Sequence, residues 1–187
     1  MAIAIINARV LAPELLYEKG AIEFDGGKIV YIGENLRDCF TGEIIDGEGH
    51  TVLPGLIDTH IHMTMDAVAN QALHYSDSDA TIALKAARNA TATLRAGFTT
   101  VRDMGAKNHV DIAVRNAIAA GMILGPRMLV SGKPICMTGG HGWVFGREAD
   151  GPDETRKAAR EQLKAGADII KIMATGGVLT AGVDPGA

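Results

Sequence analysis

Apolar residues recur in short runs along the first fifty positions, in the manner of β-strands. Positions 2–10 are rich in isoleucine and valine, and two later runs, 21–24 and 29–32, flank the sequence Asp25-Gly-Gly-Lys28. An Asp-Gly pair between two such runs predicts a β-hairpin, because tight hairpin turns need residues that readily adopt a positive φ. A further short strand is expected at 43–45. The first part of the chain is therefore predicted to be a small β region.

After Thr51 the pattern changes to strands that alternate with helices. The predicted strands cover 52–63, 98–103, 127–131 and 168–173, and the predicted helices cover 81–96, 110–120 and 153–165. Asp79 is the candidate N-cap of the first helix and Gly97 its stop. Such alternation predicts a parallel sheet with right-handed crossovers. Two architectures satisfy it: an open doubly wound sheet, and half of an eight-stranded barrel, which typically takes about 250 residues.

Composition narrows the class of protein without naming a function. Hydrophobic residues make up 47% of the 187 positions, which is enough to bury a core, and the net charge is -4. No long run of lysine or arginine occurs, which argues against nucleic acid or an anionic membrane surface as a partner. Two distant cysteines and the lack of an eighteen-residue apolar run favour a cytoplasmic protein.

A His-x-His pair, His60 and His62, ends the first strand of the alternating series, which follows a Pro-Gly turn. Residues i and i+2 of a strand point to the same face, so both imidazoles are expected to project together. Two neutral imidazoles at that spacing suit a borderline-soft cation such as zinc. The same spacing also fits two polar residues that simply end a strand.

Two aspartates are candidates for supporting this pair without binding a metal. Asp58 lies on the same predicted face as His60, one layer deeper, where it would orient an imidazole or be a buried carboxylate bonded to backbone donors. Asp103 ends the second predicted strand, directly after Arg102, where it would support the site or cap the next loop. The sequence leaves these alternatives open.

Lys171 interrupts an apolar run, Ile169 to Met173, that leads into a Gly-Gly loop. Lysine is rarely fully buried without a partner, and desolvation lowers its pKa so that it can react as a neutral amine. Such an amine can add carbon dioxide and become a carbamate, an anionic group able to bridge two metal ions. The alternative is a lysine whose ammonium group reaches solvent at the strand end.

A glycine-rich segment that carries His141 follows the third predicted strand and reads Thr138-Gly-Gly-His-Gly-Trp143. A histidine between glycines, close to the only tryptophan of the chain, suits a loop that covers a binding site. An exposed turn is the alternative.

Three of these segments together resemble the amidohydrolase superfamily: Leu53–His62, Gly97–Asp103 and Ala167–Met173. The most similar branch contains the imidazolonepropionase-like enzymes and the metal-dependent dipeptidases that cleave Xaa-Pro or Xaa-Arg/Lys peptides. The resemblance spans nearly all of the chain. It favours the barrel over the doubly wound sheet.

The resemblance implies an α/β fold, with the first half of a (β/α)8 TIM-type barrel at 53–187 and part of a small β-sandwich domain at 1–52. It implies two zinc ions in a complete site, with His60 and His62 on the more buried ion and a carboxylated Lys171 bridging both. His141 would bind a substrate carboxylate. The implied reaction is hydrolysis of a C–N bond, in a dipeptide or an N-acyl amino acid, by a metal-activated hydroxide.

The family pattern also needs two histidines on strands five and six and a catalytic aspartate on strand eight, and this sequence has none of them. We therefore expect a second half of the barrel, in a longer chain or in a partner chain, and homo-oligomers are a further expected assembly. Two alternatives stay open: a mononuclear cyclic-amide hydrolase or deaminase on the same fold, and an inactive half barrel that binds metal or a partner chain.

Overall fold

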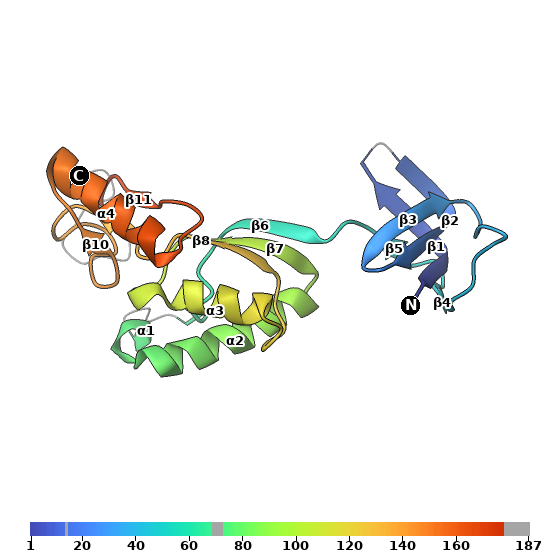
Figure 1. Cartoon of the computed structure of the whole chain (residues 1–187), viewed down its shortest axis with the longest axis horizontal. Helices are drawn as coiled ribbons and strands as arrows, with labels where there is room; N and C mark the ends of the chain where they lie inside the picture. Colours follow the sequence, from blue (N-terminus) through green and yellow to red (C-terminus); the bar gives the residue numbers. More distant parts are fainter. Residues whose placement is uncertain (14, 69–72, 178–187) are drawn as a thin grey trace. The chain divides into compact units, whose positions relative to one another are not determined.

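The computed structural model of the chain (Figure 1) describes residues 1–13, 15–68 and 73–177. The chain divides into two compact units, Met1–Pro54 and Gly55–Ala187. This boundary lies two residues beyond the one expected between 52 and 53, and the last part of the predicted barrel half, 178–187, lies outside the described residues. None of the described helices is both long enough and apolar enough to cross a membrane.

The N-terminal unit is a five-stranded sheet in the order β3-β2-β1-β4, with β5 also beside β1. The β1–β2 and β2–β3 pairs are antiparallel, whereas β4 and β5 run parallel to β1. The strands are β1 (Ile3–Ala12), β2 (Leu15–Asp25), β3 (Lys28–Gly33), β4 (Glu43–Asp46) and β5 (Thr51–Val52). The described strands of this unit form one sheet, so the predicted sandwich stays a prediction.

The hairpin predicted in this unit is confirmed. Asp25 pairs with Lys28, and the two residues between them, Gly26 and Gly27, have φ values of 56° and 76°. Glycine adopts such values at no steric cost, which is why this sequence turns here. The core of the unit is a small cluster of buried residues: Ala8, Val10 and Ile22.

Three parallel strands open the second unit in the order β6 (Leu56–Ile61), β7 (Phe98–Asp103) and β8 (Arg127–Val130). They are connected by α2 (Asp79–Arg95) and α3 (Val110–Ala119), which Figure 1 shows on the same side of the strands. Buried residues of the strands, the helices and the loops after β6 and β7 form one core: Met63, Ile82, Ala86, Ala90, Val101, Ala106, Val110, Ile112, Val114, Met128 and Val130. The predicted alternation is confirmed for these elements.

The fourth predicted strand is much shorter than the expected range 168–173. After α4 (Gly151–Ala165), β11 (Ile172–Met173) pairs in parallel with β9 (Ile135–Cys136), which also pairs with β10 (Arg147–Glu148). Yet the Val130 carbonyl accepts hydrogen bonds from the amides of Asp168, at 2.8 Å, and Ile169, at 3.3 Å. The segment therefore still runs beside the third predicted strand. The regular ladder fails between β8 and β9, where Gly132 has a φ of 68° and Pro134 has no N–H to donate.

Two details of the first strand and helix correct the sequence predictions. The expected strand 52–63 is interrupted, because Val52 ends β5 in the N-terminal unit and β6 begins only at Leu56. The N-cap of α2 is Ser78 and not Asp79, since Ser78 Oγ accepts a hydrogen bond from the Thr81 amide at 3.2 Å. Asp79 is instead the first helical residue, where its charge favours the positive end of the helix dipole. The remaining helices are short: α1 (Leu73–Ser76) and the 3-10 helix η1 (Lys107–His109).

Candidate metal centre

His60 and His62 lie side by side at the end of β6. His60 is its penultimate residue, and His62 directly follows its last residue. The two ring centroids are 5.8 Å apart and the rings are inclined by 65°. His60 is exposed and His62 is half-buried. The structure thus brings together the two imidazoles whose i, i+2 spacing predicts a shared face.

His62 is oriented by a backbone carbonyl of the next loop. Its Nδ1 lies 2.9 Å from the Gly105 carbonyl oxygen, so this nitrogen carries the proton and Nε2 carries the lone pair. Burial lowers the pKa of His62 below its ordinary value, and the positive charges of His60, Lys171 and His141 lower this pKa further, against the effect of the Gly105 bond. The result is a neutral imidazole in a fixed orientation, the form that binds a metal ion.

Asp103 acts on His62 through Gly105 and does not bind either imidazole directly. It is fully buried, and its two oxygens accept hydrogen bonds from the amides of Met63 and Gly105, both at 3.0 Å. It therefore fixes the residue after His62 and the residue whose carbonyl holds the His62 ring. Burial, with the nearby Asp111 carboxylate, raises the pKa of Asp103 to about 7.

Asp58 has a more local partner. One of its oxygens accepts a hydrogen bond from the backbone amide of His60 at 3.0 Å. This contact restrains the backbone of the strand end and corresponds to the alternative of a carboxylate bonded to backbone donors. Its role behind the imidazoles stays a prediction.

Lys171 and His141 approach the histidine pair from the C-terminal part of the second unit. Lys171 directly precedes β11, is half-buried, and accepts a backbone hydrogen bond from the Ile135 amide at 2.8 Å. A Cβ on Gly177 would overlap the His141 ring, so the half-buried ring packs against the backbone that follows β11. Phe145, in the loop of His141, meets the His62 ring, and a Cβ on Gly142 would lie 3.5 Å from the end of the Met173 side chain, so the structure places all three predicted site segments in one neighbourhood.

Sequence reasoning missed three residues around His62: Gly105, Phe145 and Tyr75. The Phe145 ring meets the His62 ring edge-on, with centroids 6.4 Å apart, and stacks on the Tyr75 ring at 4.9 Å. For Gly105 the only sequence signal was a glycine soon after a strand end. Neither aromatic residue stands out in the sequence, because their proximity depends on how the loops fold back.

The donor set fits part of a zinc site. Two neutral imidazoles at this separation suit one borderline-soft ion, and a lysine suits it only after its positive charge is removed. Among the described residues, no group of three or more His, Cys, Asp and Glu side chains is placed to hold a metal ion. The described residues of the second unit therefore do not complete such a site by themselves.

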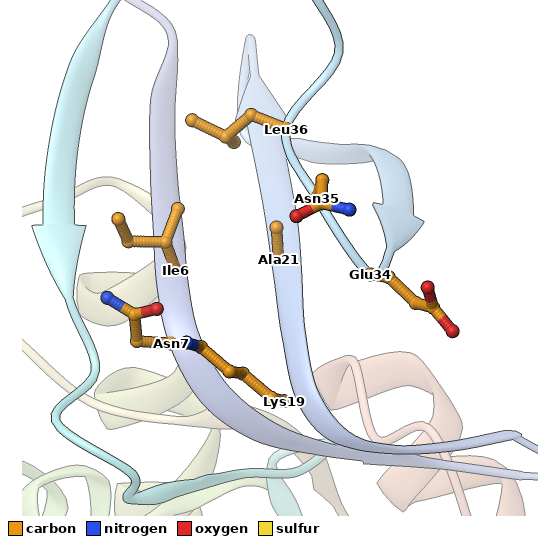
Figure 2. Close-up of a pocket in the computed structure, with 7 residues that line it drawn as sticks. All are labelled: Ile6, Asn7, Lys19, Ala21, Glu34, Asn35 and Leu36. Carbon is orange, nitrogen blue, oxygen red and sulfur yellow. The ribbon is translucent and has the colours of Figure 1, made fainter.

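A separate hollow of about 470 Å³ lies in the N-terminal unit (Figure 2). Its lining comes from β1, β2 and the segment after β3: Ile6, Asn7, Lys19, Ala21, Glu34, Asn35 and Leu36. Neither histidine nor cysteine lines it, and its two charged residues have opposite signs. It offers no alternative set of ligands for a zinc ion.

Several known proteins are similar to this chain in sequence and in fold. The profile of the Amidohydrolase family matches residues 51–187. Ochratoxinase from Aspergillus niger is 30% identical over 165 residues, which cover 72% of this chain and 33% of the relative. A solved prolidase complexed with N-methylphosphonate-L-proline has a TM-score of 0.88 at 31% identity, and the match covers 98% of this chain and 49% of the prolidase chain. A solved Xaa-Pro dipeptidase with methionine bound in its active site has a TM-score of 0.86 at 32% identity, and the match covers 96% of this chain and 48% of the dipeptidase chain. The chain spans half or less of the length of these relatives, and it belongs to the amidohydrolase family as a partial barrel.

Proposed function

We propose that this chain is the first half of a metal-dependent hydrolase that cleaves a C–N bond in a dipeptide or an N-acyl amino acid. Membership of the amidohydrolase family supports hydrolysis at an amide bond. The similarity to a prolidase and to a Xaa-Pro dipeptidase supports a substrate that ends in a free amino-acid carboxylate.

The orientation of His62 is the observation that carries this proposal. Its Nδ1 is tied to the Gly105 carbonyl, so Nε2 is the nitrogen with an available lone pair, beside the ring of His60. His60 and His62 would hold one zinc ion. When bound, such an ion lowers the pKa of a water molecule and polarises the carbonyl that is to be cleaved. The contribution of this chain is to keep His62 neutral and fixed before the ion arrives.

Lys171 is the proposed bridge to a second ion. Its neutral amine would add carbon dioxide and release a proton, which replaces a cation by an anionic carbamate. The reason lies in the position of Lys171, whose positive charge is close enough to lower the pKa of His62. An ammonium group there repels a metal ion, whereas carbamate oxygens are ligands that suit it.

The second half of the barrel would complete the site with two histidines and an aspartate. The aspartate would take a proton from the attacking water and pass it to the leaving amine. Within this chain, His141 is the proposed partner of the substrate carboxylate. It is half-buried between two glycines of a loop that packs against the segment after Lys171.

The test uses a barrel protein that continues this chain through eight strands, purified with zinc and assayed for amine release from Xaa-Pro dipeptides and N-acyl amino acids. His60→Ala and His62→Ala should each lose bound zinc and hydrolysis, because each removes a ligand. His50→Ala is the matched control, since its Nδ1 contacts the Gly47 carbonyl, within the N-terminal unit, at 3.0 Å. Unchanged zinc content and activity in both site variants would refute the proposal. A protein that binds zinc but releases no amine would refute the substrate class alone.

A further inference from the structure

Phe145 is nearly fully buried, although it belongs to the glycine-rich loop that carries His141. It is 7% exposed, whereas Trp143 and Val144 just before it are both 49% exposed. Its ring stacks on that of Tyr75 with an interplanar angle of 6°, and it meets the His62 ring at 85°. Phe145 therefore joins the loop to the segment after β6 and to a proposed metal ligand.

The backbone of Tyr75 is held by a hydrogen bond, so the ring on which Phe145 stacks belongs to a restrained residue. The Lys107 ammonium group donates hydrogen bonds to the carbonyls of Tyr75 and Asp77, both at 3.1 Å. Lys107 follows Gly105 by two residues, and Gly105 is the residue that orients His62. The backbone of Tyr75 is thus tied to the same loop that fixes the His62 ring.

On its other side, the loop packs closely against the segment that follows Lys171. A Cβ on Gly142 would lie 3.2 Å from the Phe145 ring and 3.5 Å from the end of the Met173 side chain. The His141 ring lies against Gly177 so closely that a Cβ there would overlap it. The loop is therefore held between the aromatic pair and the residues after β11.

The position of His141 depends on the turns and the packing of its loop: the Gly140 amide donates a hydrogen bond to the Met137 carbonyl at 2.9 Å, and the Phe145 amide donates to the Gly142 carbonyl at 3.1 Å. Gly140 and Gly142 flank it, and glycine has more conformational freedom than any other residue. Beyond these glycines, Phe145 is the buried aromatic anchor of the loop. Stacked aromatic pairs add stabilisation beyond the area that they bury, and their offset geometry is specific.

We propose that Tyr75 and Phe145 form a clasp that positions His141, and that this clasp sets the preference of the site for substrates with a free carboxylate. The inference rests on the proposed function, in which His141 binds that carboxylate. Tyr75 and Phe145 touch no reacting atom, so they are positioning residues. Loosening the clasp at Tyr75 should weaken carboxylate recognition while the Gly105 carbonyl still holds His62 in place.

The experiment compares a dipeptide that has a free carboxylate with its C-terminal amide, in the complete zinc-loaded barrel protein. Tyr75→Leu should lower kcat/KM for the acid about tenfold, mainly through KM, and change that for the amide by no more than about twofold. Phe145→Leu also removes the edge contact with the His62 ring, so it should lower kcat/KM for both substrates, and for the acid more than for the amide. Tyr75→Phe is the matched control: it keeps the stacked ring and should behave like the unmodified protein. His141→Ala combined with Phe145→Leu should be no worse than His141→Ala alone, because both changes remove the same interaction.

The outcomes separate the clasp from the function on which it rests. An equal loss for acid and amide in both leucine variants overturns the clasp, because a merely structural role does not distinguish the two substrates. So does full additivity of the double variant. If His141→Ala leaves the preference for the acid intact, the role proposed for His141 fails, and carboxylate recognition by this loop fails with it. If Phe145→Leu does not fold, Tyr75→Leu still provides the measurement, because it breaks the stacked pair and keeps the Phe145 ring beside His62.

Discussion

The Asp103 carboxylate is fully buried, so Asp103→Asn is expected to change how the stability of the second unit depends on pH. Its two oxygens accept hydrogen bonds from the Met63 and Gly105 amides. Burial, with the nearby Asp111, raises the pKa of Asp103 from 3.8 to about 7. Asparagine preserves the shape of the side chain, but it has no charge and only one acceptor oxygen.

The size and sign of the effect follow from this pKa. A rise from 3.8 to about 7 corresponds to about 4 kcal/mol, at about 1.4 kcal/mol per pKa unit. Between these two pH values the folded state binds a proton that the unfolded chain has lost, so stability falls as the pH rises through this window. The variant lacks this titration. Its loss of stability relative to the unmodified protein should therefore be greatest near pH 4 and smaller by up to about 4 kcal/mol at pH 8.

Urea unfolding of the complete barrel protein, followed by circular dichroism from pH 4 to pH 8, measures this difference. A chelator removes metal ions, because metal binding adds its own pH dependence. Asp153→Asn is the matched control: its carboxylate is 95% exposed, and surface substitutions usually shift stability by no more than about 0.5 kcal/mol. A loss of stability for Asp103→Asn that stays constant, or grows as the pH rises, would refute the reasoning.

Three further predictions concern the site and the assembly. Lys171→Ala should inactivate the complete barrel protein, and bicarbonate or short carboxylic acids should partly restore its activity. Lys171→Arg should also be inactive, because guanidinium forms no carbamate. A Lys171→Arg variant that keeps two zinc ions and near-normal activity would show that Lys171 has a structural role. Gly105→Ala should weaken zinc binding in titrations, because its φ is 128° and a Cβ would lie 2.7 Å from Pro134, so the carbonyl that holds His62 must move. Gly49→Ala is its control, with a φ of 75° and no atom within 4 Å. The 187-residue chain made alone should self-associate, because β6 pairs on one side only among the described strands and so exposes a strand edge. Light scattering that shows a monodisperse monomer, together with cooperative unfolding, would contradict this.

The order of strands and helices in the second unit could be predicted from the sequence because each element follows a local rule. Gly97 and Gly121 follow α2 and α3 with φ values of 93° and 70°, the conformation that commonly ends a helix. The apolar strand β6, at whose end His60 and His62 lie, follows a Pro-Gly turn and pairs in parallel with β7. Both signals depend on residues that are close in sequence.

The ends of the elements depend on partners that the sequence does not reveal. Ser78 and Asp79 are both good capping residues, and only the hydrogen bond to the Thr81 amide distinguishes them. The apolar run 168–173 is suited to a strand throughout. Its ladder is limited to β11 because the neighbouring chain between β8 and β9 is bent and contains Pro134.

The orientation of His62 escaped prediction for a different reason: its partner is a backbone carbonyl, which every residue possesses. What marks position 105 is a glycine, required by the φ of 128° and by the nearby proline, and not a polar side chain. The Gly105 carbonyl faces His62 while its amide binds Asp103. Two amides meet Asp103, and only a carboxylate offers an acceptor oxygen to each. A buried carboxylate with a raised pKa is costly in free energy, and its position explains why the chain keeps it: it fixes both the carbonyl that orients His62 and the backbone that follows it.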